Sequence, residues 1–183
     1  MPKFAANLSM MFNELPFLDR FAAAANAGFK GVEFLFPYEH TPEAIEGKVK
    51  AAGIEIVLFN MPPGDWAAGE RGIASIPGRE EEFRDGVDKA LAYALYLKVP
   101  RLHAMAGIPK GFDPAVCRKT LVENLHYAAQ KLAPHKITLL LEAINTRDIP
   151  GFFVTTQRDS HAICQEVGAP NLKMQMDLYK MPL

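Results

Sequence analysis

The sequence predicts an α/β fold built on a parallel sheet, and it favours a (β/α)₈ barrel represented here by about six strands. Short apolar segments alternate with longer amphipathic ones along all 183 residues. The apolar segments contain few polar residues, which is typical of strands buried in a parallel sheet. A barrel brings the C-terminal ends of its strands to one rim, where its chemistry takes place. Polar residues stand at the predicted strand ends: Asn7, Asn60, His103, Glu142 and Asp177.

Three strand–helix units are predicted in the first half of the chain. Gly28 is placed to end the first helix, and Gly53 precedes the third strand. The second helix opens with Thr41, Pro42 and Glu43, which supply a cap, a first-turn proline and an acid near the positive end of the helix dipole. The strands are expected over 4–8, 31–36 and 54–60, and the helices over 16–27, from 41 onward and over 80–97.

The second half continues the alternation. An apolar run over 137–141 leads directly into Glu142, and a polar loop follows. Burying a carboxylate is costly, so a strand that ends on one suggests that this end of the sheet uses it. The strands are expected over 101–105, 137–142 and 172–177, and the helices over 114–133 and 156–167. We therefore expect one barrel-like domain over 1–183 that lacks the last two βα units.

A doubly wound sheet is the alternative architecture. Such a sheet binds a nucleotide at a glycine-rich turn after its first strand. The corresponding turn here reads NLSMMFNELP and contains no glycine. The barrel is favoured for this reason and for its polar strand ends, although a complete barrel needs roughly 200 to 250 residues.

Composition argues against several classes of partner. The chain has 20 basic and 21 acidic residues, so it lacks the positive charge that nucleic acids or anionic membranes attract. No stretch approaches the ~18 apolar residues of a membrane span, and the first residues do not resemble a signal peptide. Cys117 and Cys164 are far apart in the sequence, which fits packed thiols in a reducing compartment. These observations predict a cytoplasmic protein that acts on small molecules.

Two neighbouring strand ends predict a metal site. Glu142 and Asp177 end the fifth and sixth strands, which would be adjacent in a barrel. Carboxylate oxygens from adjacent strands suit Mg²⁺ or Mn²⁺, with waters completing the coordination. The alternative is that each carboxylate pairs with a nearby basic side chain or caps a helix. His103 has two readings as well, as a contact at the rim or as a hydrogen-bonded core histidine.

The loop over 61–79 is a second candidate region. It contains Asp65, Trp66, Glu70 and Arg71. Loops of more than about 12 residues inside compact domains are often functional. This one could serve as a lid or as a contact between subunits, or it could be an ordinary surface loop.

Six stretches carry a resemblance to a known family: FAANLSMMF, GVEFLFPY, FNMPPGDWAAGERGIASIPGR, LHAMAG, LLLEAINTRD and MQMDLY. Together they resemble the hydroxypyruvate isomerase family, which is close to the 2-oxo-tetronate isomerases among the xylose isomerase-like TIM barrels. The resemblance implies interconversion of hydroxypyruvate and tartronate semialdehyde through an enediolate, without a nucleotide cofactor. It also implies that Glu142 and Asp177 bind Mg²⁺ or Mn²⁺, and that Glu142 transfers the proton.

Candidate substrate contacts are Asn7, His103, Arg147 and Lys180. Lys180 stands where the family's DLYH-like motif has a histidine, and an ammonium group cannot reproduce the paired donor and acceptor of an imidazole. The family continues for two further strands, which carry another metal ligand and a second catalytic glutamate. The resemblance therefore implies a chain truncated at its C-terminus.

Two further readings stay open at this point. The chain could be an inactive remnant that binds a metal or a hydroxy acid and associates with itself. It could also be an endonuclease of the related barrel type, which the neutral charge balance disfavours. In either case an incomplete barrel exposes the edges of its first and last strands, so we expect a homo-oligomer.

Overall fold

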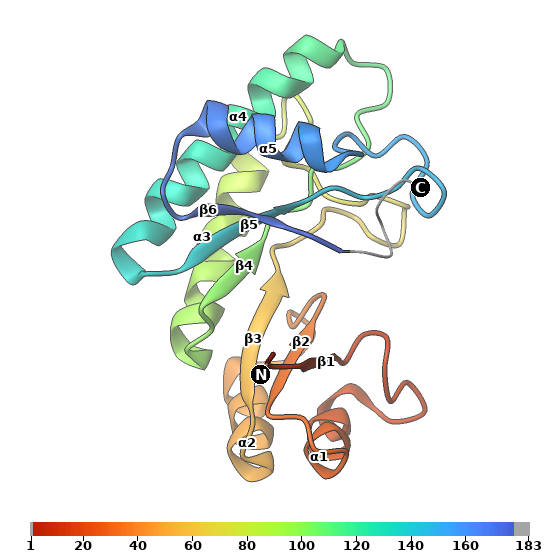
Figure 1. The fold of residues 1–183 in the computed structure, drawn as a ribbon, viewed down its shortest axis with the longest axis vertical. Helices are drawn as coiled ribbons and strands as arrows, with labels where there is room; N and C mark the ends of the chain where they lie inside the picture. Colours follow the sequence, from red (N-terminus) through yellow and green to blue (C-terminus); the bar gives the residue numbers. More distant parts are fainter. Residues whose placement is uncertain (1, 178–183) are drawn as a thin grey trace.

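The computed structural model describes residues 2–177 and shows an open sheet of six parallel strands (Figure 1). The strands lie side by side in chain order, without the reversal of order that marks a doubly wound sheet. This order confirms the barrel-type arrangement, including the adjacency of the fifth and sixth strands. The strands are β1 (Ala5–Asn7), β2 (Gly31–Phe34), β3 (Glu55–Asn60), β4 (Arg101–His103), β5 (Thr138–Glu142) and β6 (Leu172–Gln175).

The helices pack against one another in chain order, from α1 to α5. In Figure 1, α1 and α2 lie beside β1 to β3, and α3 to α5 lie around β4 to β6. None of the helices within residues 2–177 is long and apolar enough to cross a membrane. Their bounds are η1 (Phe17–Asp19), α1 (Arg20–Asn26), α2 (Pro42–Ala52), α3 (Glu80–Leu97), α4 (Pro114–Leu132), η2 (Ala133–His135) and α5 (Gln157–Val167).

Local hydrogen bonds explain where the helices begin and end. The Thr41 hydroxyl accepts from the Ala44 amide at 3.3 Å at the start of α2, as the sequence predicts. Thr156 caps α5 in the same way. Gly53 ends α2 with φ of 63°, a left-handed conformation that suits glycine. The first predicted helix differs, because it begins as the 3₁₀ turn η1 before α1.

Four strands end earlier than the sequence predicts, β1 by one residue and three others by two. β2 stops at Phe34, β4 at His103 and β6 at Gln175, two residues early in each case. After β2 the amide of Leu35 donates to the Ser9 hydroxyl at 2.8 Å instead of to a strand, while the Leu35 carbonyl still accepts from the Asn60 amide of β3. Asp177 therefore lies two residues beyond the end of β6 rather than at it.

The two faces of the sheet differ in chemistry. One face packs on the helices and forms the core, with Val32, Phe34, Leu102, Leu139 and Leu141 almost or fully buried. Side chains alternate between faces along a strand, so the residues between these ones point to the other side. We call that side the inner face. It carries polar residues near the C-terminal strand ends: Asn7, Glu33, Asn60, His103, Glu142 and Gln175.

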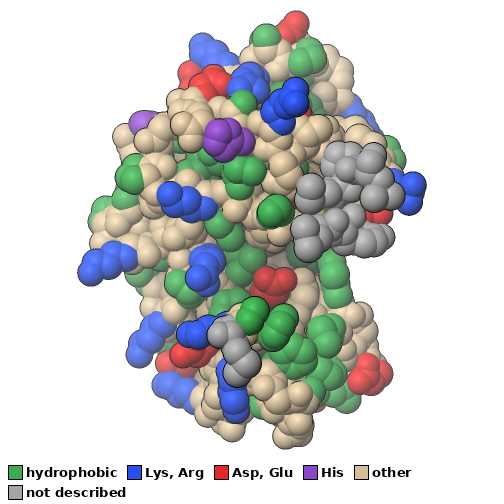
Figure 2. Space-filling view, in the orientation of Figure 1, with side chains coloured by type: hydrophobic (Ala, Val, Ile, Leu, Met, Phe, Trp, Pro, Cys, Tyr) green, Lys and Arg blue, Asp and Glu red, His purple; other side chains and the backbone are tan. Residues whose placement is uncertain are grey.

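The surface in this orientation is mixed in character (Figure 2). Hydrophobic side chains gather in the middle of the view, next to an acidic one, whereas Lys and Arg lie mainly along the left side. Cys117 is buried in α4 and Cys164 is partly buried in α5, and both are free thiols. Burial raises the pKa of both thiols, which makes them poor nucleophiles, in agreement with their interpretation as packed residues.

Candidate functional site

The polar residues of the inner face meet in pairs across neighbouring strands. Asn7 and Glu33 are in register on β1 and β2, and the Asn7 amide donates to the Glu33 carboxylate at 3.0 Å. Asn60 and His103 are in register on β3 and β4, with 3.2 Å between Asn60 Oδ1 and His103 Nδ1. Both members of this second pair are buried. The predicted strand-end residues are thus held in a row by their neighbours on the sheet.

Glu142 continues this row on β5. Only 3% of the residue is exposed, although it ends a strand in a loop-rich region. Its in-register partner on β6 is Gln175, whose amide donates to Glu142 Oε1 at 3.4 Å. Gln175 Oε1 is itself buried and accepts no hydrogen bond from residues 2–177. Asp177 follows two residues later and is partly buried. This end of the inner face therefore collects oxygen acceptors.

The donor set is compatible with a hydrated divalent cation. Within residues 2–177, no three His, Cys, Asp or Glu side chains come together as a ready-made metal site. Mg²⁺, however, is commonly held by one or two carboxylates and keeps several of its waters. Glu142 and Asp177 would supply two such carboxylates, and the Gln175 carbonyl oxygen, which has no hydrogen-bond partner within residues 2–177, would add a third hard acceptor. The chemistry of these groups fits Mg²⁺ or Mn²⁺ better than a thiophilic metal.

The remaining predicted substrate contacts are less closely associated with the row. Arg147 is exposed in the loop after β5. Asn145 holds that loop in shape, since its Oδ1 accepts from the amides of Arg147 and Asp148 at 3.0 and 2.8 Å. Lys180 lies outside the described residues.

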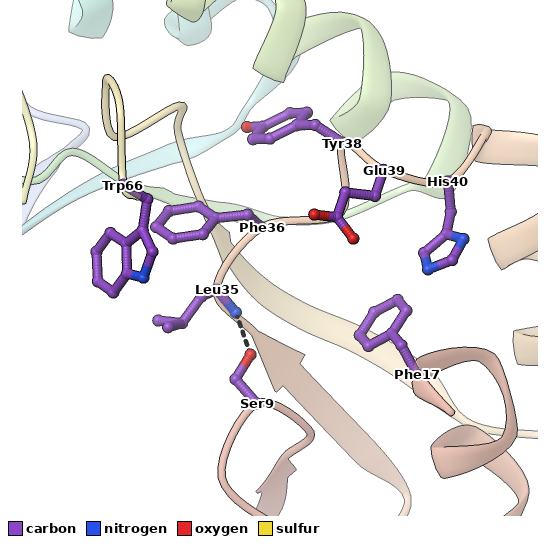
Figure 3. A pocket seen from close by; sticks show the side chains of 8 residues that line it. All are labelled: Ser9, Phe17, Leu35, Phe36, Tyr38, Glu39, His40 and Trp66. Carbon is purple, nitrogen blue, oxygen red and sulfur yellow. Dashed lines mark hydrogen bonds between the residues drawn. The ribbon is translucent and has the colours of Figure 1, made fainter. Parts of the chain in front are cut away.

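A pocket of about 250 Å³ opens beyond the C-terminal ends of β1 and β2 (Figure 3). Aromatic contacts form its walls: Phe36 meets Trp66 at 5.0 Å between ring centroids, and Phe17 stacks on His40 at 5.3 Å. Its lining residues are Ser9, Phe17, Leu35, Phe36, Tyr38, Glu39, His40 and Trp66. The sequence did not predict this pocket or the place of His40 in its wall. The one local signal was the unusual density of aromatic residues in FLFPYEH after the second strand.

Tyr38 connects the pocket with the row of strand-end residues. Its hydroxyl donates to the main-chain oxygen of Asn60 at 2.8 Å. Burial raises the pKa of the Tyr38 phenol well above its ordinary value, and the nearby Tyr93 adds to the effect. The phenol therefore stays protonated and acts as a fixed hydrogen-bond donor to the last residue of β3.

The long loop over 61–79 is docked rather than free. Gly72 forms an antiparallel bridge with Ala106, in the loop that follows β4. The amide of Ala74 donates to the Met105 carbonyl at 3.3 Å, and the segment over 73–75 is buried. The loop consequently covers the end of β4, and its outer part carries Trp66 toward the pocket (Figure 3).

An ion-pair clasp closes the outer part of this loop. The Glu70 carboxylate accepts hydrogen bonds from the Asp65 amide and from the Arg79 guanidinium, and Arg79 also pairs with Glu82 at 2.7 Å. Arg79 holds the pKa of the Glu70 carboxyl below its ordinary value of 4.5. The clasp thus joins the loop to the first turn of α3.

We expect the Glu70→Gln substitution to weaken the clasp by about 1 kcal/mol at neutral pH, since partly exposed ion pairs contribute about that much. Because folding lowers the carboxyl pKa, its stabilisation is complete above the unfolded-state value and is lost as pH falls through the folded-state value, below 4.5. The fluorescence of Trp66, the single tryptophan, reports the loop in urea titrations at pH 7 and pH 3. The difference between wild type and variant should be smaller at pH 3 than at pH 7.

The matched control for this prediction is Glu81→Gln. Glu81 is exposed in the same helical turn, and no ion pair among the described residues involves it. A pH-dependent effect of equal size in this control would attribute the change to general surface charge rather than to the clasp.

Residues 21–181 match the family model described as xylose isomerase-like TIM barrel. The chain is 57% identical over 180 residues to a 2-oxo-tetronate isomerase from Cupriavidus necator, covering 98% of this chain and 69% of that relative. It is 50% identical over 182 residues to a hydroxypyruvate isomerase from Escherichia coli, covering 99% of this chain and 70% of that one.

A solved structure shares the fold closely. It is described as an AP endonuclease, family 2, from Brucella melitensis, and it superposes with a TM-score of 0.97 at 57% identity. The match covers 99% of this chain and 70% of that one. The six-stranded sheet and its helices therefore correspond to an arrangement that a crystal structure also contains.

Proposed function

Because this chain belongs to the xylose isomerase-like TIM barrel family, we propose that it is an isomerase of small hydroxy-oxo acids. The names of the two curated relatives support an isomerase function. The proposed reaction interconverts hydroxypyruvate and tartronate semialdehyde, without a nucleotide cofactor. The four-carbon acid 2-oxo-tetronate is a second candidate substrate, because a relative at 57% identity is named for it.

The observation that carries this proposal is the buried carboxylate of Glu142 on the polar inner face. Moving a carbonyl to the neighbouring carbon requires removal of a proton from the carbon that bears the hydroxyl group. Glu142 takes this proton, which leaves an enediolate, and returns a proton to the adjacent carbon, while the proton of the hydroxyl group passes to the former carbonyl oxygen. Its burial keeps bulk water away from the reacting carbons, which suppresses side reactions.

Neighbouring residues hold the substrate oxygens. The Asn60 oxygen is an acceptor for His103 Nδ1, so Nδ1 carries the proton and the imidazole ring is held in one orientation. Asn7 is fixed in a comparable way by Glu33. These residues position the hydroxyl and carbonyl groups of the acid against Glu142, and such positioning by itself contributes to rate enhancement.

Glu142 and Asp177, with the Gln175 oxygen beside them, would hold Mg²⁺ or Mn²⁺. When bound, the cation would stabilise the negative charge of the enediolate oxygens. We expect chelation by EDTA to reduce turnover by about 100-fold or more, and added Mn²⁺ or Mg²⁺ to restore it. Turnover can be followed by NMR on protein whose metal content is measured in parallel. Full activity in metal-free protein would remove the cation from the proposal.

The function itself is tested by solvent exchange. Hydroxypyruvate and 2-oxo-tetronate are incubated in D₂O with the folded protein, Mn²⁺ and a protein-free blank. Deuterium uptake at the carbon bearing the hydroxyl, together with appearance of the isomeric product, supports the isomerase. Circular dichroism confirms that the sample is folded. Absence of exchange from a folded, metal-loaded sample would contradict the proposal.

The competing function is that of a hydroxy-acid-binding protein without turnover. Binding of an acid without any exchange would favour it. We also propose that the chain forms homo-oligomers, because β1 and β6 present open edges in the six-stranded sheet. A monodisperse monomer in light scattering at micromolar concentration would contradict this association.

A further inference from the structure

Arg71 has an unusual environment in the docked loop. Its guanidinium carbon lies 3.9 Å from the centre of the Trp66 ring, which is close packing for a cation on an aromatic face. One nitrogen, Nη1, donates to the main-chain oxygens of Glu70 at 2.7 Å and of Trp66 at 3.2 Å. The side chain is thus held in place by neutral groups of its own loop.

The nearest carboxylate in the sequence does not balance this charge. Glu70 is the preceding residue, but its carboxylate is bound to the Arg79 guanidinium and to a main-chain amide. Within residues 2–177, none of the ion pairs involves Arg71. A planar guanidinium that is rigid, partly buried and still lacks an anion is prepared to bind a carboxylate.

The loop places Arg71 at the same end of the sheet as the candidate site. The loop after β3 meets the loop after β4 where Gly72 pairs with Ala106. That loop in turn meets the one after β5, since the Gly107 oxygen accepts from the Phe153 amide at 2.9 Å. Adjacent strands are about 4.8 Å apart, so β3 and β5 are separated by roughly 10 Å. The main chain next to Arg71 therefore lies at the C-terminal ends of the strands, the end of the sheet that also carries His103 and Glu142.

We propose that Arg71 recognises the carboxylate of the hydroxy-oxo acid and thereby determines the specificity of the site for acids over neutral sugars. This inference rests on the proposed isomerase function. Trp66 and the two main-chain oxygens hold the guanidinium in a fixed orientation, so the substrate carboxylate finds its partner already positioned. Trp66 also lines the aromatic pocket, and its ring links Arg71 to that wall.

A binding experiment separates this inference from catalysis. Glycerate has the carboxylate of hydroxypyruvate but no carbonyl, so it cannot isomerise, and glycerol is its neutral counterpart. Both are titrated into the metal-loaded protein while Trp66 fluorescence and heat are recorded. We expect wild type to prefer glycerate by at least tenfold. Arg71→Gln, which keeps hydrogen-bond donors but not the charge, should lose about 10- to 100-fold in glycerate affinity and leave glycerol unaffected.

Arg84→Ala is the matched control. Arg84 also lies over an aromatic ring, that of Tyr127 at 5.1 Å, but on the exposed surface of α3. This variant should bind glycerate as wild type does. Arg71→Lys keeps the charge without the planar group, and we expect an intermediate affinity. Equal loss in the Arg84 and Arg71 variants, or unchanged glycerate binding in Arg71→Gln, would overturn the assignment.

Kinetics give the second readout. In Arg71→Gln the KM for hydroxypyruvate should rise about 10- to 100-fold, with a kcat change of threefold or less, because the lost contact is made equally in the bound and reacting states. A large fall in kcat with KM unchanged would contradict a recognition role. If wild type binds glycerate through Arg71 but shows no exchange with either acid, the carboxylate site stands and the isomerase proposal fails. If exchange occurs and Arg71→Gln alters neither glycerate binding nor KM, the isomerase proposal stands and the assignment of Arg71 fails.

Discussion

Replacing Glu142 by glutamine is expected to reduce proton exchange from hydroxypyruvate by about 10³-fold or more. The substitution removes the basic oxygen that takes the substrate proton, and loss of a positioned base typically costs 10²- to 10⁴-fold. It also removes one charge from the proposed cation site. Glutamine keeps nearly the same shape, and its carbonyl oxygen can still accept from the Gln175 amide. The fold should therefore be preserved, and the effect should appear mainly in kcat.

The measurement is deuterium uptake by NMR at saturating substrate, with circular dichroism to verify folding. Glu55→Gln is the matched control, because Glu55 begins β3 at the opposite end of the sheet and is exposed. That variant should exchange at the wild-type rate. Glu142→Asp retains the charge but shortens the side chain, and it should retain part of the activity. Wild-type exchange in Glu142→Gln would exclude Glu142 as the base.

Much of the architecture could be predicted because its signals are local. The helix over 80–97 agrees with α3 at both ends, and Thr41 caps α2 as expected. The chain order of the strands follows from strict alternation of strands and helices, each of which returns the chain to the neighbouring position. The pairing of Asn60 with His103 at the ends of β3 and β4 appears only in the structure, because the sequence predicts that the fourth strand runs on to 105.

The parts that escaped prediction depend on contacts between distant segments. Leu35 and Phe36 continue an apolar run, so they read as strand, but the hydroxyl of Ser9, 26 residues earlier, takes the Leu35 amide out of the sheet. Docking of the loop over 61–79 is likewise invisible in its composition, which is that of a surface loop. Only the structure shows that Arg71 stacks on Trp66 while the adjacent Glu70 binds Arg79. No local sequence pattern distinguishes such a docked loop from an ordinary surface loop.

The docked loop also gives the largest stability effect that we expect, at Gly72. This residue has φ of +108°, a conformation that side chains other than glycine adopt at a cost. A Cβ atom built here would lie 2.3 Å from the Met105 carbonyl oxygen, well inside contact distance. Gly107, on the opposite segment, is equally crowded, since a Cβ atom there would lie 2.3 Å from the Gly72 carbonyl oxygen. The main chains at Gly72 and at Met105 to Gly107 thus cross at van der Waals distance. Main-chain atoms cannot move aside as the end of a flexible side chain would.

Gly72→Ala should therefore destabilise the protein by about 3 kcal/mol, from strain and overpacking combined. For a domain of this size the expected fall in Tm is roughly 6 to 12 °C. Alternatively the segment over 73–75 detaches from β4, with loss of its amide bonds to the loop after β4. Urea titrations followed by Trp66 fluorescence and by far-UV circular dichroism separate the two outcomes. If the loop detaches, the fluorescence change occurs at a lower urea concentration than the dichroism change. Either outcome also displaces Arg71, so glycerate binding should weaken in parallel.

Gly69→Ala is the control that isolates the steric contact from the backbone conformation. Gly69 lies in the same loop with φ of +91°, but a Cβ atom there would meet nothing within 4 Å. Its cost should be only the conformational one, about 1 to 2 kcal/mol. If Gly72→Ala is no more destabilising than Gly69→Ala, and Trp66 fluorescence is unchanged, the close crossing with Met105 is not what secures the loop. A clearly larger effect at Gly72 would show that the loop carrying Trp66 and Arg71 depends on this crossing for its position over the strand ends.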